Sequence, residues 1–230
     1  MQIIFAYEHL LDYIFHFTIL NEERCVMVEI QIAPDASTKG RILYMALSMF
    51  YERGYDKVST REIAESVGIK VASIYNHFES KEKILEALYD FYIAECKKAM
   101  PDTDELMRLA ETEPPHEVLM RWNYRVDPSV QKTVDMIIAL AIREMHFNPM
   151  TETFVRTNMV GGLNWIRPLL ERMMECKRIE PINIDAFLCV LAGFTFYAIA
   201  MSGKSLEIGM DNWNAGLEMI FSLVKPLGGA

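Results

Sequence analysis

The amino-acid sequence predicts an all-α protein. Apolar residues recur at helical spacing along nearly all of the 230 residues, whereas the strict alternation typical of strands is scarce. Prolines and glycines break this pattern at intervals, and 51% of the residues are hydrophobic, which is enough to bury a large core. We therefore expect all-helical domains from residue 38 onwards.

Residues 1–37 precede these domains as a leader. Its apolar residues alternate at spacings of four and three, which permits an amphipathic helix. These residues are Ile3, Tyr7, Leu10, Ile14 and Phe17. No Lys or Arg occurs before Arg24, so the leader does not fit a secretory signal peptide. Met27 is an alternative start of translation, in which case residues 1–26 do not belong to the native protein.

Local signals fix the first helices. The first expected helix begins at Thr38 and ends at Gly54, which suits a C-cap. Ser59 begins the next helix, since Glu62 stands three residues later and completes a capping box. That helix is short, because Gly68 ends it.

The rest of the chain continues as helices. A second short helix is expected over residues 70–77, and Ser80 then caps a long helix over residues 81–100. Further helices follow between breaks that are mostly made by proline. They are expected over residues 104–111, 115–126, 128–147, 150–178, 184–202 and 211–225.

Residues 59–81 have the spacing of a helix-turn-helix. Ala64 is small where the second helix crosses close to the first, and Gly68 supplies a turn that favours positive φ. A small apolar core fixes the angle between the two helices. Its expected members are Ile63, Val67, Ile69, Ile74 and Phe78.

Two stretches of this segment closely resemble the signature of the tetracycline-repressor (TetR) family. They read TREIAESVGI at residues 60–69 and SIYNHFESKEKIL at residues 73–85. The resemblance implies a three-helix DNA-binding domain over residues 38–84 and a ligand-binding and dimerisation domain over residues 85–230. It implies a cytoplasmic homodimer that regulates transcription. We expect a repressor that a small apolar or aromatic effector releases from a palindromic double-stranded DNA operator.

The residues that open the second short helix are expected to face base edges in the major groove. They are Lys70, Val71, Ala72 and Ser73. The family usually has a capping serine where this sequence has Lys70, so the cap is weaker and a contact to phosphate or guanine is added. The alternative is an exposed helix start that touches no base.

Other residues of the motif are expected to bind the DNA backbone. Tyr75 and His77, like the family's matching residues, are predicted to hydrogen-bond phosphates, although packing against the first helix is an alternative role. Thr60 and Lys81 stand at helix starts, where free N–H groups favour phosphate. Arg61 and Asn76 complete the expected DNA-binding set; for Arg61, a solvated surface charge is the alternative.

Net charge alone argues against nucleic acid, because the whole chain carries −9. The charge is unevenly divided, however. Residues 38–84 hold eight basic and six acidic residues, a net charge of +2, which leaves −11 for the rest of the chain. Attraction to DNA is local, so this division is compatible with a DNA-binding N-terminal domain on an acidic body.

The larger domain is rich in side chains that suit a pocket for apolar or aromatic molecules. The candidate ligand-binding residues are Trp122, Met136, Glu144, Trp165 and Tyr197. The alternative for each of them is ordinary core packing. The last two helices are the candidate dimer interface, as the family dimerises through a four-helix bundle; an intrachain core is the alternative.

Rival functions find less support. The sequence has five His and no HExxH, CxxC, GxSxG or GxGxxG motif, so we predict neither an enzyme nor a metal or cofactor site. An adaptor without DNA binding would not need Tyr75, His77 and Lys81. The scattered cysteines suit a reducing cytosol. The apolar stretch over residues 186–201 is too short for a membrane span.

Overall fold

The computed structural model describes residues 37–122, 126–201 and 210–227, which form two compact units. The N-terminal unit comprises residues 37–99 and 126–158. The C-terminal unit comprises residues 100–122, 159–201 and 210–227. The expected leader helix and Met27 lie outside the described residues.

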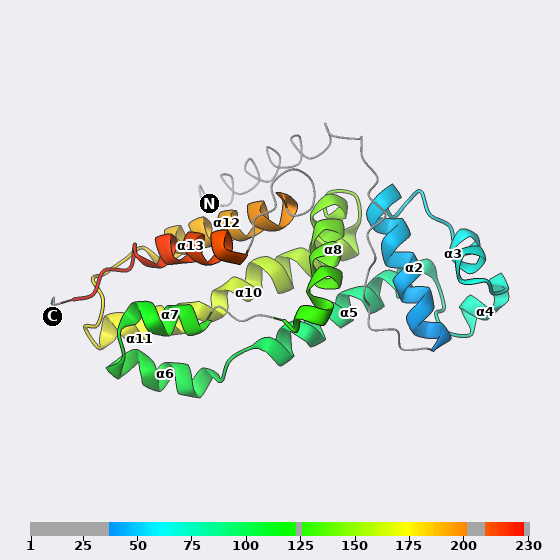
Figure 1. The fold of residues 1–230 in the computed structure, drawn as a ribbon. Helices are drawn as coiled ribbons and strands as arrows, with labels where there is room; N and C mark the ends of the chain where they lie inside the picture. Colours follow the sequence, from blue (N-terminus) through cyan, green and yellow to red (C-terminus); the bar gives the residue numbers. More distant parts are fainter. Residues whose placement is uncertain (1–36, 123–125, 202–209, 228–230) are drawn as a thin grey trace. The chain divides into compact units, whose positions relative to one another are not determined.

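The N-terminal unit consists of helices joined by turns (Figure 1). Its helices are α2 (Thr38–Arg53), α3 (Thr60–Val67), α4 (Val71–Tyr75), α5 (Lys81–Ala99), α8 (Pro128–Glu144) and α9 (Pro149–Phe154). Helix α2 packs against α3, α5 and α8, and α3 packs against α4. The unit therefore joins the helix-turn-helix to helices from both sides of the predicted boundary at residue 84.

The predicted end of α2 and both ends of α3 are confirmed, whereas the helix expected over residues 70–77 is shorter, Val71–Tyr75. The Ser59 side chain accepts from the Glu62 backbone N–H, and Glu62 accepts from the Ser59 N–H at 2.8 Å, so the capping box is complete. Gly68 ends α3 in the left-handed region at φ 77°, and Gly54 ends α2 at φ 90°. Both positions favour glycine because other L-residues rarely adopt positive φ.

The expected small core of the motif also forms. Ile63, Val67, Ile74 and Phe78 are buried, and Ala64 is fully buried at the crossing of the helices. Ile69, the fifth expected member, is only half-buried. Elsewhere in this unit, the Tyr89 ring of α5 stacks on Phe154 of α9 with 4.0 Å between ring centroids. The Tyr89 hydroxyl lies 2.7 Å from the buried Thr151 hydroxyl. These contacts tie α5 to α9.

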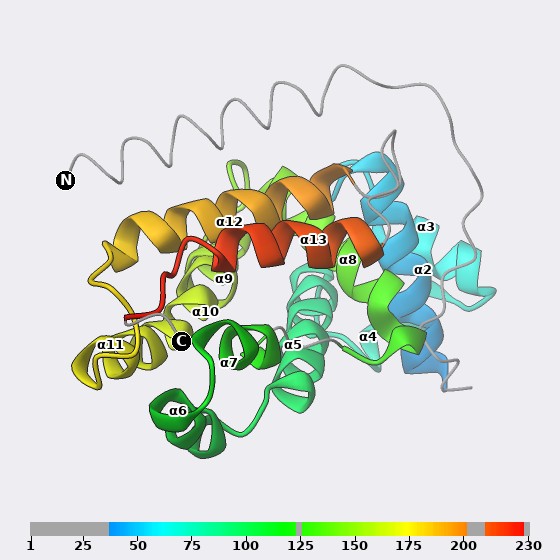
Figure 2. The same cartoon turned by 60° about the vertical axis from the view of Figure 1, so that its left-hand side comes forward.

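The C-terminal unit contains α6 (Thr103–Thr112), α7 (Pro115–Trp122), α10 (Gly161–Leu163), α11 (Arg167–Glu175), α12 (Ile184–Met201) and α13 (Met210–Phe221). Figure 2 shows α12 and α13 side by side. Gly216 permits this approach, because a Cβ there would lie 2.3 Å from Cζ of Phe194. The Phe194 and Trp213 rings pack with centroids 5.3 Å apart.

The helix expected over residues 150–178 is found as unbroken helical backbone over residues 149–175, but it is not a regular α-helix. After α9 the backbone forms a π-helix over Val155–Val160, the short α10, and a 3-10 turn over Asn164–Ile166 before α11 begins. Two features of the sequence explain this irregularity. Gly161 and Gly162 weaken an α-helix, and Pro168 has no N–H with which to continue the helical hydrogen bonds.

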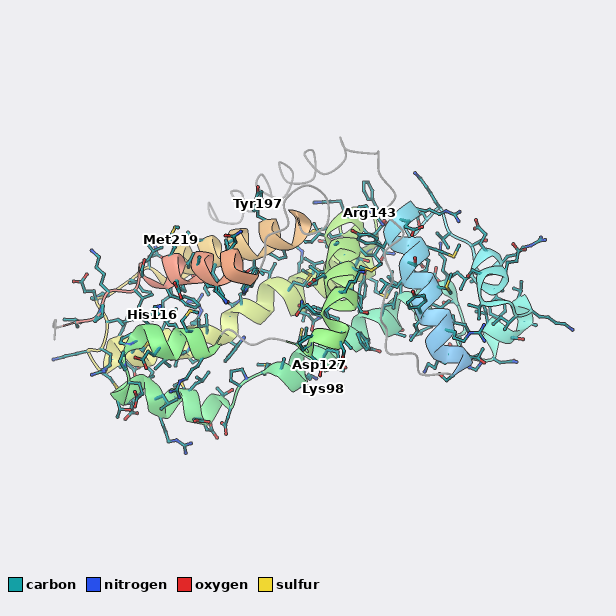
Figure 3. All side chains as sticks on the ribbon, viewed as in Figure 1. Lys98, His116, Asp127, Arg143, Tyr197 and Met219 are labelled. Carbon is teal, nitrogen blue, oxygen red and sulfur yellow. The ribbon has the colours of Figure 1, made fainter. Side chains whose placement is uncertain are left out.

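The large apolar side chains of α13 face the interior of the C-terminal unit. Leu217, Ile220 and Phe221 are buried in the core of the C-terminal unit. The side chains that α12 and α13 leave exposed are others, among them Val190, Tyr197 and Met219. Tyr197 and Met219 are labelled in Figure 3. No helix in the described ranges is long and apolar enough to cross a membrane.

Candidate nucleic-acid interface

All of the predicted DNA-binding residues lie in the N-terminal unit, at the start of α3, along α4 and at the start of α5. Six of them are exposed: Arg61, Lys70, Ala72, Tyr75, Asn76 and His77. Tyr75 is 51% exposed, which is unusual for so large an aromatic side chain. The Tyr75 side chain is therefore accessible to a binding partner at this surface.

Helix α4 is short and firmly attached on one side. Ile74 is fully buried, and the Phe78 and His77 backbone N–H groups both donate to its carbonyl at 2.9 Å. Val71 and Ser73 are half-buried, whereas Lys70 and Ala72 are exposed. Lys70 occupies the N-cap position without a side-chain cap, as its replacement of serine predicts. Its ammonium group is thus not used to complete the helix.

The start of α3 meets the end of α4 through a pair of hydroxyl groups. Thr60 Oγ1 lies 3.3 Å from the Tyr75 hydroxyl oxygen. Both residues were expected to bind phosphate, and the structure places them together. One hydroxyl of the pair can donate to the other, which leaves a second O–H free to donate to a phosphate oxygen. The free backbone N–H groups at the start of α3 lie next to it and can donate to the same phosphate.

An ion pair neutralises the acidic residue at the same helix start. Arg53 donates to Glu62 at 2.6 Å and to the Lys57 carbonyl at 3.0 Å. The hydrogen bond from Arg53, together with those from Ser59, lowers the pKa of Glu62 to about 2. Glu62 therefore stays ionised near neutral pH while Arg53 offsets its charge beside the expected phosphate position.

Lys81 has a role that the sequence did not reveal. Its ammonium donates to the carbonyls of Tyr55 and Val58, both at 3.1 Å, and lies 4.0 Å from the centroid of the Tyr55 ring. The Lys81 ammonium group thus stabilises the turn before α3 by binding two of its carbonyl groups. These partners stand 26 and 23 residues away, so no local pattern in the sequence could have indicated them.

The predicted ligand-binding residues are divided between the two units. Met136 and Glu144 are buried on α8 in the N-terminal unit. Trp165 and Tyr197 belong to the C-terminal unit, where Trp165 packs on the core and Tyr197 is exposed, and Trp122 ends α7. Glu144 accepts hydrogen bonds from the Tyr55 backbone N–H and from Arg143, each at 3.2 Å, so its carboxylate is committed to protein partners.

A cavity of about 220 Å³ lies in the C-terminal unit beside the irregular backbone before α11. An Arg167–Asp185 ion pair of 2.5 Å stands at this cavity. Its lining residues are Val160, Leu163, Asn164, Arg167, Asp185, Leu188 and Cys189. None of the predicted ligand-binding residues is among them. The described residues contain no cluster of three or more potential metal ligands.

Comparison with known proteins bears on the helix-turn-helix. Residues 42–88 match the family described as bacterial regulatory proteins, tetR family. The chain carries a TetR-family domain. This domain contains α3, α4 and the start of α5, with all of the predicted DNA-binding residues.

A curated relative supports the same assignment. The chain is 42% identical over 66 residues to the HTH-type transcriptional repressor KstR2 of Mycolicibacterium smegmatis. That alignment covers 26% of this chain and 32% of the relative, so the chain matches about a third of the relative's length. The aligned segment of 66 residues is thus somewhat longer than the stretch of residues 42–88 that matches the family.

Solved structures match over most of the chain. The TetR-family transcriptional regulator PfmR from Thermus thermophilus superposes with a TM-score of 0.60 at 18% identity, covering 79% of this chain and 97% of that one. AibR in complex with isovaleryl coenzyme A and operator DNA gives a TM-score of 0.54 at 16% identity, covering 82% and 98%. The helices that follow the TetR-family domain therefore have the fold of these regulators.

Proposed function

We propose that the protein is a sequence-specific DNA-binding regulator of transcription, and that it acts as a repressor. The observation that carries this proposal is the match of residues 42–88 to the TetR family together with the exposed face of α4. Helix α4 is anchored by Ile74 and presents Lys70 and Ala72 to solvent. A helix attached along one side, with its first residues free, is the geometry that reads base edges in the major groove.

Phosphate contacts would position this helix on the duplex. The Thr60–Tyr75 hydroxyl pair and the exposed His77, which follows the end of α4, are the groups that would contact the DNA backbone beside the groove. The local charge supports this arrangement, since residues 38–84 carry +2 within a chain of −9. The small positive charge favours binding by two copies over binding by one.

A homodimer is the form we propose for DNA binding. Val190 and Tyr197 on α12 and Met219 on α13 are exposed apolar side chains within the C-terminal unit. Such side chains are candidates for burial against a second copy, which would present two α4 helices to a palindromic site. The molar mass of the protein in solution tests for the dimer, and the spacing of the half-sites in the bound DNA tests whether two α4 helices bind together.

A small-molecule effector is the remaining part of the proposal. AibR, a structural neighbour, binds isovaleryl coenzyme A, which supports an effector site in a fold of this kind. For this chain we propose an apolar or aromatic effector, bound by the helices that follow the TetR-family domain, and neither a catalytic activity nor a metal cofactor. A screen for compounds that release the protein from its operator identifies the effector.

The test of the function is selection of bound duplexes from a random pool by the purified full chain. The proposal predicts enrichment of a palindrome whose half-sites lie about 10 bp apart, one turn of B-DNA, or a multiple of that distance. Recovery of unrelated sequences in proportion to their input would refute it. Deletion of the gene should also raise transcription next to the enriched site; lowered transcription would indicate an activator.

A further inference from the structure

The carboxyl end of α8 binds the carboxyl end of α2. A helix leaves most of its last carbonyl groups without partners in the helix itself. Arg143 of α8 donates at 2.7 Å to one such group in α2, the Tyr51 carbonyl. It also donates to the Phe50 carbonyl, which accepts from the Gly54 N–H as well. Figure 3 labels Arg143 where α8 and α2 meet. One guanidinium therefore binds the end of a helix that is 92 residues away in the sequence.

The next residue of α8 binds the turn that follows α2. The carboxylate of Glu144 accepts from the Tyr55 backbone N–H and from Arg143, both at 3.2 Å. Glu144 is only 6% exposed, so a charge is kept in the interior by these donors. Gly54 passes directly beside it, since a Cβ at Gly54 would lie 3.5 Å from the carboxylate.

The same turn is held from the opposite side. Lys81 of α5 donates to the Tyr55 and Val58 carbonyls, and the Phe50 and Tyr55 rings pack edge to face at 5.1 Å. Residues 54–58, which we call the α2–α3 turn, thus have charged partners from α8 and from α5. Ser59 and Thr60 follow this turn directly, so its position sets where α3 begins.

We propose that Arg143 and Glu144 are positioning residues for operator recognition. They fix the α2–α3 turn and thereby the orientation of α3, of the Thr60–Tyr75 hydroxyl pair and of α4. The inference rests on the proposed function and adds to it residues of α8, outside the TetR-family domain, that determine how well the motif fits its operator. Both residues would act through the turn, since their side chains bind protein groups.

The alternative is that the pair only adds stability. The two roles differ in what they do to specificity. A loss of stability alone lowers the amount of folded protein and weakens binding to every duplex alike. A misplaced α3 weakens binding to the operator, which needs a particular geometry, more than binding to a scrambled duplex, which depends on charge.

The experiment compares Arg143→Met with Arg156→Met in the full chain. Arg156 is an exposed arginine of the same unit that pairs with Glu152, so the control removes the same charge without touching the α2–α3 turn. Affinity is measured for the selected duplex and for its scrambled version at one salt concentration. Amide hydrogen exchange at Tyr55 is followed in the same proteins.

We expect Arg143→Met to lower operator affinity about tenfold, as for the loss of charge-assisted hydrogen bonds, with the scrambled duplex bound as before. Exchange at the Tyr55 N–H should accelerate, and Arg156→Met should match the unchanged protein. An unaltered operator affinity, or an equal loss on both duplexes, would overturn the inference.

A milder change keeps the test decisive if Arg143→Met does not fold. Arg143→Lys retains the charge and one of the two carbonyl contacts, so it should give an intermediate loss of the operator-to-scrambled ratio. A ratio equal to that of the unchanged protein would overturn the inference. If the unchanged protein itself shows no preference for any selected duplex, the proposed function fails and this inference fails with it.

Discussion

The hydroxyl oxygens of Thr60 and Tyr75 lie 3.3 Å apart and join the start of α3 to the end of α4. Tyr75 is half-exposed, so its hydroxyl can reach a phosphate while it keeps this contact. We predict that Tyr75→Phe lowers operator affinity about fivefold, the cost of one hydrogen bond of about 1 kcal/mol. The sequence preference should stay the same, because a phosphate contact carries no base information. Tyr44→Phe, a half-buried tyrosine of α2 outside the predicted DNA-binding set, is the control. Equal effects of the two changes would argue against the contact.

Lys70 tests whether α4 reads bases. It is exposed at the N-cap position and makes no side-chain cap. Lys70→Ala should cost about 1–3 kcal/mol on the selected duplex and relax the preference at one base pair of each half-site. Repeating the duplex selection with the variant measures this directly. Lys57→Ala, an exposed lysine of the α2–α3 turn, should leave the preferred sequence as it was. A Lys70→Ala protein that selects the same site with the same stringency contradicts base reading.

Gly216 tests the packing of α12 on α13. The added methyl group of Gly216→Ala would lie 2.3 Å and 2.4 Å from two atoms of the Phe194 ring, so the ring or the helix must move. We expect a loss of about 1–3 kcal/mol in the free energy of unfolding, typical of overpacking. Gly162→Ala is a matched control, because a Cβ there meets nothing within 4 Å. Denaturant unfolding should show the loss for the first variant alone, and equal midpoints for both would contradict the close approach.

The lowered pKa of Glu62 leads to a prediction of how the free energy of unfolding depends on pH. Its pKa is lowered from 4.5 to about 2 by Arg53 and Ser59, so the folded state binds this proton less tightly than the unfolded state does. The stabilisation is therefore complete above the unfolded pKa and is lost as the pH falls from about 4.5 towards 2. Glu62→Gln should flatten the pH dependence of unfolding in that window. An unchanged slope between pH 5 and pH 2 would show that the Arg53–Glu62 pair is absent in solution.

Features that depend on neighbouring residues could be predicted from the sequence. The capping box of Ser59 and Glu62 and the turns at Gly54 and Gly68 follow from local backbone chemistry, and each was found where expected. The apolar periodicity predicts the helix over residues 150–178 but not the π-helical and 3-10 segments inside it, although Gly161, Gly162 and Pro168 are residues that disturb an α-helix.

Contacts between distant residues could not be predicted. Arg143 and Glu144 find their partners in α2 and in the turn after it, and nothing local in either segment indicates the other. Glu144 was for this reason expected to bind a ligand, while the structure gives its carboxylate two protein donors. Lys81 is a similar case, since its position after Ser80 suggested phosphate and its ammonium binds two carbonyls.

The central claim is that α4 reads DNA sequence, and the most direct test is the ratio of two affinities. The full chain is titrated at physiological salt with the selected duplex and with a scrambled duplex of the same composition. The account predicts operator binding tighter by about 10³ or more, as for specific regulators. A ratio near one would contradict it, because binding would then rest on the charge of the surface alone.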